Sequence, residues 1–488
     1  MLGLAVSLIL ARSLVFSIWE QAGFDSDQAV IGLMAKHLSE LRAFPVFMYG
    51  QAYILGVEAW MAAPVFRIAG PSVLALKLPL IVINIIVGVL LILLLEREVK
   101  LRPALGLVAT LFFIVPPPGT AATLVDASGG NLEPFLYVLL LWLTRRRPLA
   151  FGAILAFGFL HRSFTIYGLG AILLIDALEG TLFRPPYLRS KLPMLGSMAA
   201  VWIGIDILKR FSSLAGPGTS MATLDLPPSS LAEVAGRFCW SAATVPSGLA
   251  KIVTEHWPIL FGLHKQPLWE LKIDTPLYQG AAWVSVVFGG ILLLVLVRAA
   301  THFKISQFDA WRRIGRSHFC LYLGLVGFLS AVAYAIGRCG EISIYTLRYD
   351  LLSLLLPIGL VAWYLATERS NVGKTVCTLL VICWALTSLW PHAQLIAQYT
   401  HRPPRGVKSE IAAHLLARGI HFGTSDYWIA YHVTFLTNEQ VILAATEVPR
   451  ILSYRAIVDA HRDEAVHVSR IPCPDGESIM PGVYLCKL

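Results

Sequence analysis

Apolar stretches of membrane-spanning length alternate with short basic segments along most of the 488-residue chain. A helix that crosses a bilayer needs about 20 mostly apolar residues. The pattern therefore predicts an all-α polytopic membrane protein with about eleven transmembrane helices. The predicted helices are centred near residues 2–19, 77–95, 104–116, 132–144, 149–160, 163–178, 192–208, 279–298, 319–337, 350–366 and 375–391.

The two neighbouring stretches 149–160 and 163–178 are short, and one long kinked helix is an alternative interpretation of them. Basic residues help to decide between the two interpretations. With eleven helices and a cytoplasmic N-terminus, every cytoplasmic loop carries Lys or Arg, whereas the opposite loop 116–130 carries neither. This is the positive-inside distribution. Merging the two stretches would place the later basic loops outside, so eleven helices are favoured.

An odd number of helices puts the C-terminal region on the same non-cytoplasmic side as the first loop, 20–76. Within that loop, apolar side chains repeat on one face of residues 26–42, which predicts an amphipathic helix along the membrane interface. Residues 52–69 predict an apolar helix. A second long segment on this side, 209–278, contains Gly-Pro-Gly and Pro-Pro sequences and predicts an irregular loop or lid.

We expect two domains, a transmembrane domain over residues 1–399 and a small extracytoplasmic α/β domain over residues 400–488. Cys473 and Cys486 could form a disulfide if this region is exported, although spacing alone does not establish the bond. Helix-like and strand-like patterns alternate in the second domain at 405–418, 427–436, 441–445, 449–460 and 466–471.

The composition supports this class of protein. Hydrophobic residues make up 56% of the chain and charged residues 14%, which excludes an ordinary soluble globular protein. The net charge of +9 lies in short clusters between apolar stretches, so we expect a lipid bilayer and no nucleic acid as partner. The first stretch has no basic leader and contains Arg12, and so predicts a span, not a cleavable signal peptide.

Two carboxylates, Asp25 and Asp27, follow the first predicted helix at the membrane boundary. One interpretation is helix capping, because Asp25 followed by Gln28 resembles a capping box and acids stabilise a helix N-terminus. The other interpretation is catalysis by a carboxylate at the membrane surface. The two interpretations are compatible with each other.

Several short segments follow one another along the chain: FDSDQA at 24–29, YGQAY at 49–53, EAW at 58–60, FRIAG at 66–70, GGNLEP at 129–134, LRYD at 347–350 and DYWIAY at 426–431. In this order they resemble segments of the C-type (GT-C) membrane glycosyltransferases, in particular the bacterial branch related to protein O-mannosyltransferases and the lipid A aminoarabinose transferase. The resemblance covers most of the chain and is distributed over these segments.

The resemblance implies transfer of a sugar from a polyprenyl-phosphate donor to an acceptor hydroxyl, with inversion, at the non-cytoplasmic face of the plasma (inner) membrane. The acceptor would be a lipid, a glycan or a protein. Asp27 inherits the role of the catalytic acid residue. The Glu that commonly follows is replaced by Gln28, so a second carboxylate would have to come from Asp25. The family includes metal-dependent and metal-independent members, which leaves a divalent metal cofactor open.

Two further acids are expected to support the site. Glu58 lies in an otherwise apolar helix, where a carboxylate needs a partner or a hydrated cavity. The alternatives are snorkelling to the membrane interface and a structural salt bridge. Glu133 begins a predicted span on the non-cytoplasmic side, where stabilisation of the helix start is equally plausible. Asp126, in the same loop, is a weaker candidate.

The predicted ligands of the donor phosphate are two pairs at non-cytoplasmic ends of spans. Ordinary interfacial anchoring by Arg and Tyr is the alternative. The two pairs are His161 with Arg162 and Arg348 with Tyr349. We expect Asp350 to pair with Arg348, and Tyr427 to pack within its own domain.

A transporter or lipid flippase is the main alternative function, and a non-catalytic assembly or receptor protein is a third. Transporters usually contain repeated halves and ionisable residues near the centres of their spans. Here the acids gather at the boundaries of the spans and no internal repeat is visible, so the glycosyltransferase is favoured.

Overall fold

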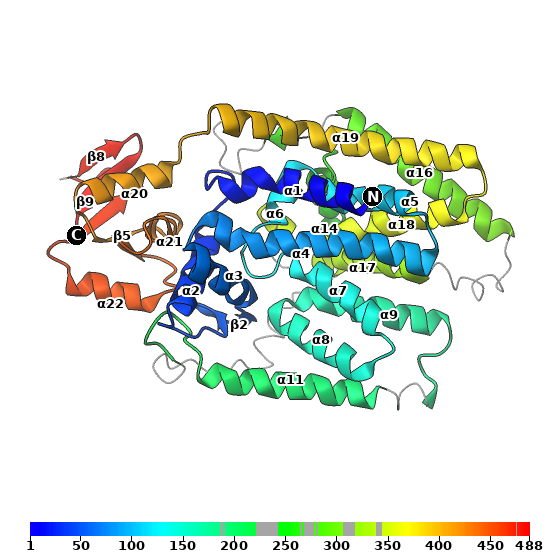
Figure 1. The fold of residues 1–488 in the computed structure, drawn as a ribbon, viewed down its shortest axis with the longest axis horizontal. Coiled ribbons are helices and arrows are strands. Elements are labelled where there is room, and N and C mark those ends of the chain that lie inside the picture. Colours follow the sequence, from blue (N-terminus) through cyan, green and yellow to red (C-terminus); the bar gives the residue numbers. More distant parts are fainter. Residues whose placement is uncertain are drawn as a thin grey trace.

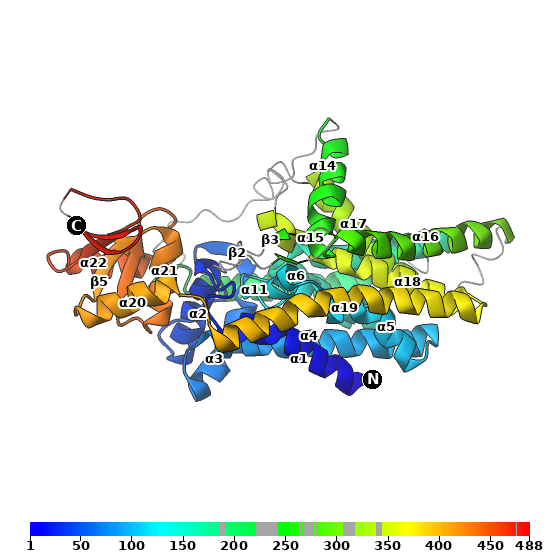
Figure 2. The same cartoon turned by 90° about the horizontal axis from the view of Figure 1, so that it is seen from above.

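The computed structural model describes residues 1–185, 189, 191–220, 243–263, 266–267, 278–279, 282–305, 318–337, 344–474 and 476–488. Most of these residues are helical, and the long helices run side by side (Figures 1 and 2). The N-terminus lies partway along the helical bundle, and α16 and α19 extend beyond it (Figure 1). The C-terminal α/β unit lies at one end of the molecule, next to α2 and α3 (Figure 1).

Every stretch predicted to span the membrane coincides with a helix. Within the described residues, five helical segments are long and apolar enough to cross a membrane, as in an integral membrane protein. The number of helices that cross the bilayer stays a prediction. The eleven helices are α1 (Leu2–Ile18), α4 (Val73–Leu94), α5 (Pro103–Ile114), α7 (Glu133–Thr144), α8 (Pro148–His161), α9 (Ile166–Leu178), α11 (Leu192–Arg210), α16 (Ala282–Ile305), α17 (His318–Gly337), α18 (Leu355–Thr367) and α19 (Asn371–His401).

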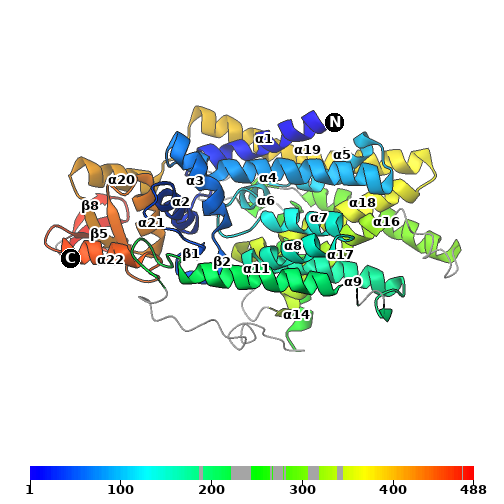
Figure 3. The same cartoon turned by 60° about the horizontal axis from the view of Figure 1, so that its bottom comes forward.

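Helices α8 and α9 are separate. Arg162 has an extended backbone, with φ −148° and ψ 125°, and the short 3-10 helix Ser163–Thr165 follows it. The end of α9 and Arg145, which follows α7, line one cavity, so the chain reverses between α8 and α9. Helix α8 also packs along α11 (Figure 3). The interpretation as one kinked helix is therefore wrong.

The first loop is more varied than its sequence pattern predicts. It contains α2 (Ser26–Ser39), the strands β1 (Phe47–Met48) and β2 (Gln51–Leu55), and α3 (Val57–Ala69). The predicted apolar helix therefore begins later than expected, because its first residues pair with β1 as an antiparallel strand.

Helix α2 does not present a polar face to solvent. All of its residues from Gln28 to His37 are buried, since α3 covers one side and α21 (Tyr427–Leu436) of the C-terminal unit covers another. The expectation of a helix exposed along the membrane interface is wrong. The polar face of α2 instead binds the C-terminal unit.

The second long segment is partly helical where it is described. It contains α14 (Val245–Lys251), a π-helical turn (Ile252–His256) and α15 (Trp257–Leu260), and α14 packs on α17. The short helix α6 (Pro118–Thr123) contacts α15. A short strand pair, β3 (Gln266–Pro267) and β4 (Tyr278–Gln279), lies further along the chain. Residues 221–242, 264–265 and 268–277 of the predicted lid lie outside the described residues.

The C-terminal unit is an α/β fold, as its alternating patterns predict. Its sheet has the strand order β6-β5-β7-β9-β8; the first three strands are parallel and the last two antiparallel to their neighbours. Cys473 and Cys486 form a disulfide. The sequence patterns did not reveal β5, β8 or β9. The elements are α20 (Val407–Ala417), β5 (Phe422–Ser425), α21, β6 (Ile442–Ala445), α22 (Leu452–Ala460), β7 (Val466–Ser469), β8 (Glu477–Met480) and β9 (Val483–Lys487).

Glu439 fastens this unit to α2. Its carboxylate pairs with Lys36 and Arg42, and accepts a hydrogen bond of 2.8 Å from the Tyr454 hydroxyl. His37 Nε2 lies 2.9 Å from the same carboxylate. Burial by itself would raise the pKa of Glu439, but hydrogen bonds from His37, Lys36 and Arg42 outweigh it and hold the pKa well below its usual range.

Neutralising Glu439 should release the C-terminal unit. A carboxylate whose pKa is lowered by folding stabilises the fold above the unfolded pKa and loses this effect as pH falls through the folded pKa. In Glu439→Gln, we expect about 3 kcal/mol less docking stability at neutral pH. We also expect a weaker dependence of stability on pH below about 4.5. Thermal unfolding and proteolysis between α19 and α20, measured across pH, test this. The exposed Glu464→Gln is the control, and an unchanged pH dependence in Glu439→Gln would contradict the assignment.

Candidate active site

Asp27, in the first turn of α2, lies between two residues that are distant in the sequence. The hydroxyl of Tyr427 donates a hydrogen bond of 2.6 Å to Asp27 Oδ1. Arg348 Nη1 lies 3.5 Å from Asp27 Oδ2. The Asp27 side chain keeps 25% of its surface exposed, so both contacts hold the carboxylate without sealing it from a ligand.

Aromatic rings hold Arg348 in place. It belongs to the 3-10 helix Ile344–Tyr349, and its guanidinium carbon lies 5.2 Å from the centre of the Tyr349 ring. Tyr349 in turn stacks on Tyr334 of α17 and meets the edge of the Phe164 ring. A planar guanidinium packed against an aromatic ring loses little freedom when it binds an anion.

A second guanidinium, that of Arg162, is close enough to Arg348 for the two positive charges to repel. Burial, followed by the charge of Arg348, lowers the pKa of Arg162. Arg162 Nη2 donates to the Ser128 carbonyl oxygen at 3.3 Å. The Nε atoms of both arginines are buried and have no hydrogen-bond partner among the described residues. This pair can therefore bind an anionic group that supplies acceptor oxygens, such as a phosphate.

Asp25 caps α2, as one of the two interpretations predicts. Its Oδ1 accepts the backbone N–H of Gln28 at 3.1 Å. The Gln28 amide donates to the Gly23 carbonyl oxygen at 2.7 Å, so this residue supports the turn before the helix. Asp25 thus has a structural role whether or not it also takes part in catalysis.

Lys77 and Asp126 complete a charged cluster around the two aspartates. Lys77 is buried in α4 and donates to the Phe16 carbonyl oxygen at 2.8 Å. Burial raises the pKa of Asp126 well above its usual range, and the charge of Asp25 adds to the increase, whereas Lys77 and Arg348 oppose it. The cluster contains three acids and two cations, which is the composition of a site that binds charged groups.

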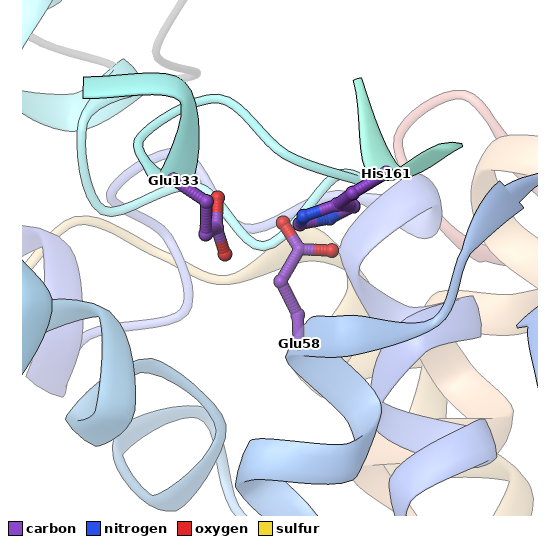
Figure 4. Close-up of side chains that lie close together, drawn as sticks. All are labelled: Glu58, Glu133 and His161. Carbon is purple, nitrogen blue, oxygen red and sulfur yellow. The ribbon is translucent and has the colours of Figure 1, made fainter. Parts of the chain in front are cut away.

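Glu58 and Glu133 face each other and His161 beside this cluster (Figure 4). The Glu58 carboxylate accepts the backbone N–H of Gly129 at 2.8 Å and that of Gly130 at 2.7 Å. Both glycines have positive φ angles, 87° and 90°, which other residues rarely adopt. Burial and the charge of Glu133 raise the pKa of Glu58 to about 8.

The structure places the predicted phosphate ligands in two separate groups. Arg162, Arg348 and Tyr349 form one group near Asp27, whereas His161 turns away toward the two glutamates. Asp350 pairs with His256 at 3.8 Å and with Ser353, so the expected pairing with the preceding arginine is wrong. Arg348 pairs with Asp27 instead.

The sequence patterns did not predict the positions of two residues at this site, Tyr427 and Lys77. Tyr427 was expected to pack only within its own domain, yet its hydroxyl reaches Asp27. Lys77 was counted as the first residue of an apolar span. A lysine buried in a membrane helix is itself a signal of a functional site, and it could have been recognised from the sequence.

The fold is that of the C-type membrane glycosyltransferases. No protein-family model and no curated protein matches the sequence. Among solved structures, ArnT from Cupriavidus metallidurans bound to undecaprenyl phosphate matches with a TM-score of 0.54 at 10% identity, over 96% of this chain and 93% of that one. The apo Archaeoglobus fulgidus oligosaccharyltransferase matches with a TM-score of 0.50 at 14% identity, over 96% and 69% of the respective chains.

Proposed function

We propose that this protein is an integral-membrane glycosyltransferase that takes a sugar from a polyprenyl-phosphate donor. The observation that carries the proposal is the position of Asp27, held by Arg348 and Tyr427 beside two guanidinium groups with unused donors. A carboxylate next to an anion-binding pair fits a reaction in which a hydroxyl loses a proton and a phosphate leaves. The ArnT structure with undecaprenyl phosphate supports a lipid-phosphate donor.

In this mechanism, the acceptor hydroxyl attacks the anomeric carbon of the donor sugar from the face opposite the phosphate. The new bond joins the acceptor oxygen to that carbon, the bond from the carbon to the phosphate oxygen breaks, and the configuration inverts. Asp27 orients the hydroxyl and accepts its proton. Arg348, Arg162 and Lys77 stabilise the negative charge of the departing polyprenyl phosphate.

The other acids take supporting parts. Asp25 holds the start of α2 and adds negative charge near Lys77. Asp126 shares the same charged cluster. The proposal places the site on the non-cytoplasmic face of the plasma (inner) membrane, within the domain of residues 1–399, and the unit of residues 400–488 covers it from outside. The acceptor would be a lipid, a glycan or a protein.

The direct test is transfer by the full-length protein in membranes. A panel of labelled polyprenyl-phosphate sugars would be supplied together with a cell-envelope extract, and the labelled product identified by mass spectrometry. We expect one donor to give a product with inverted anomeric configuration. If the protein moves labelled lipid across vesicles without cleaving any donor, the transporter alternative is correct and the proposal is wrong.

Tyr427 is proposed as a positioning residue for Asp27. Removing its hydroxyl in Tyr427→Phe takes away the hydrogen bond that orients Asp27 Oδ1. We expect kcat to be about 10-fold lower, with the KM for the lipid donor little changed. The thermal unfolding temperature should change little. Tyr431→Phe in the same helix is the control, since its hydroxyl accepts hydrogen bonds from the backbone N–H groups of Arg450 and Ile451. An unchanged kcat in Tyr427→Phe would refute this role.

A further inference from the structure

Three ionisable side chains meet in one buried cluster beside the proposed active site. Glu58 comes from the first turn of α3, Glu133 from the first turn of α7, and His161 from the end of α8. One ligand atom from each lies within 4.8 Å of the other two. All three residues are at most 1% exposed, and Figure 4 shows both carboxylates and the imidazole directed toward a common point.

The cluster contains polar atoms that the described protein leaves unsatisfied. The Glu133 carboxylate is met only by the backbone N–H groups of Leu132 and Glu133 within the described residues. His161 Nε2 has no hydrogen-bond partner among those residues. Burying two facing carboxylates without compensation costs several kcal/mol. Arg162 offsets part of the negative charge of Glu58, but its Nη2 is directed to the Ser128 carbonyl oxygen.

The surroundings of His161 prepare it for a ligand. Its Nδ1 lies 2.9 Å from the Tyr137 hydroxyl. When Nδ1 carries the proton and donates it to Tyr137, Nε2 presents a lone pair to the two carboxylates. Histidines that bind metals commonly use such a second partner to fix the ring and its tautomer. Glu58 is fixed in a comparable way by the N–H groups of Gly129 and Gly130.

We propose that Glu58, Glu133 and His161 bind a divalent transition-metal ion. Two carboxylates and one imidazole match the ligand types of Zn²⁺ and Mn²⁺, and leave at least one position for water. Zn²⁺ binds these ligands at about 2.0–2.2 Å, so the cluster would close around the ion through small side-chain rotations. The ordinary order of affinities places Zn²⁺ above Mn²⁺. This inference does not rest on the proposed sugar transfer.

The ion would cross-link separate elements of the fold. It would join α3 of the first loop to the ends of α7 and α8, next to the turn formed by Gly129 and Gly130. A Cβ atom at position 130 would lie only 2.5 Å from the Arg162 side chain and 3.0 Å from His161 Nε2. The glycine therefore lets the backbone approach both residues. Because Arg162 follows His161 in the sequence, the bound ion would also fix the backbone that carries Arg162.

Metal analysis of the full-length protein in detergent provides the first test. After chelation and dialysis, the protein should take up about one Zn²⁺ per chain and gain thermal stability as free Zn²⁺ increases. In Glu133→Gln, the affinity for Zn²⁺ should fall by at least about 10-fold. This variant should unfold no more easily than the wild type without metal, since it loses the repulsion between the carboxylates. His392→Gln is the matched control, because His392 is buried but its Nε2 lies 2.9 Å from the Pro116 carbonyl oxygen.

Two further variants identify the ligands even if Zn²⁺ uptake is low. In His161→Cys loaded with Co²⁺, a sulfur-to-cobalt charge-transfer band should appear that the wild type lacks. Tyr137→Phe should weaken Zn²⁺ binding by about 10- to 100-fold, since it removes the partner of Nδ1. Absence of both the cobalt band and Zn²⁺-dependent stabilisation would overturn the proposal and leave a pair of carboxyl groups that share a proton. Zn²⁺ uptake that is unchanged in Glu133→Gln would also overturn it.

Discussion

Replacing Asp27 with Asn is expected to reduce sugar transfer by about 10²- to 10⁴-fold, the usual contribution of a positioned general base. The amide keeps the size of the side chain and can still contact Tyr427 and Arg348, so the fold should be retained. The measurement is the initial rate of product formation with a saturating lipid donor, together with the thermal unfolding temperature.

Two further variants make the Asp27 result specific. Asp459→Asn removes an exposed carboxylate that pairs only with its neighbour Arg455 within the described residues, and should leave transfer unchanged. Asp25→Asn should keep the cap of α2, because Asn caps helices as well as Asp does, and should therefore lose much less activity than Asp27→Asn. Full transfer activity in Asp27→Asn would remove this residue from the mechanism.

Replacing Arg348 with Ala should have the second largest effect, a loss of about 10²- to 10³-fold in transfer. The variant loses a ligand of the donor phosphate and also leaves Asp27 without its cation. We expect weaker binding of polyprenyl phosphate as well as slower turnover. Arg348→Lys should restore only part of the activity, because an ammonium group cannot form the paired, planar contacts of a guanidinium.

The readouts for Arg348 are the KM for the lipid donor and the affinity for polyprenyl phosphate without a sugar. Arg455→Ala is the control, since it removes an arginine from an exposed ion pair far along the C-terminal unit. A normal KM for the donor combined with a low kcat in Arg348→Ala would mean that Arg348 acts on Asp27 alone. Unchanged values of both quantities would exclude Arg348 from the site.

The helices were predictable because their signal is local. The stretch 77–95 is almost entirely apolar over the length of a span, and α4 forms there. The separation of α8 from α9 also followed from charge, since the basic loops require a reversal at Arg162. The late start of α3 was not predictable, because pairing between β1 and β2 depends on a partner strand and not on periodicity.

From the sequence, individual residues of the site could be predicted, but the contacts between them could not. Asp27 and Arg348 stood out as charges at the ends of spans, and the structure joins them. The contact between Asp27 and Tyr427 crosses a sequence separation of 400 residues, and no local pattern encodes such a contact. The burial of α2 was missed for the same reason, since its polar face resembles one exposed to water until the C-terminal unit covers it.

The separation of Asp27 from Tyr427 has a consequence for biosynthesis. At about 5–20 residues per second, translation of the intervening 400 residues takes about 20 to 80 s. During that time α2 is already synthesised, but Tyr427 is not yet available to contact Asp27. A nascent chain stalled before residue 400 would therefore hold inserted helices around an unfinished site. Such a chain would lack the Tyr427 hydroxyl that holds Asp27.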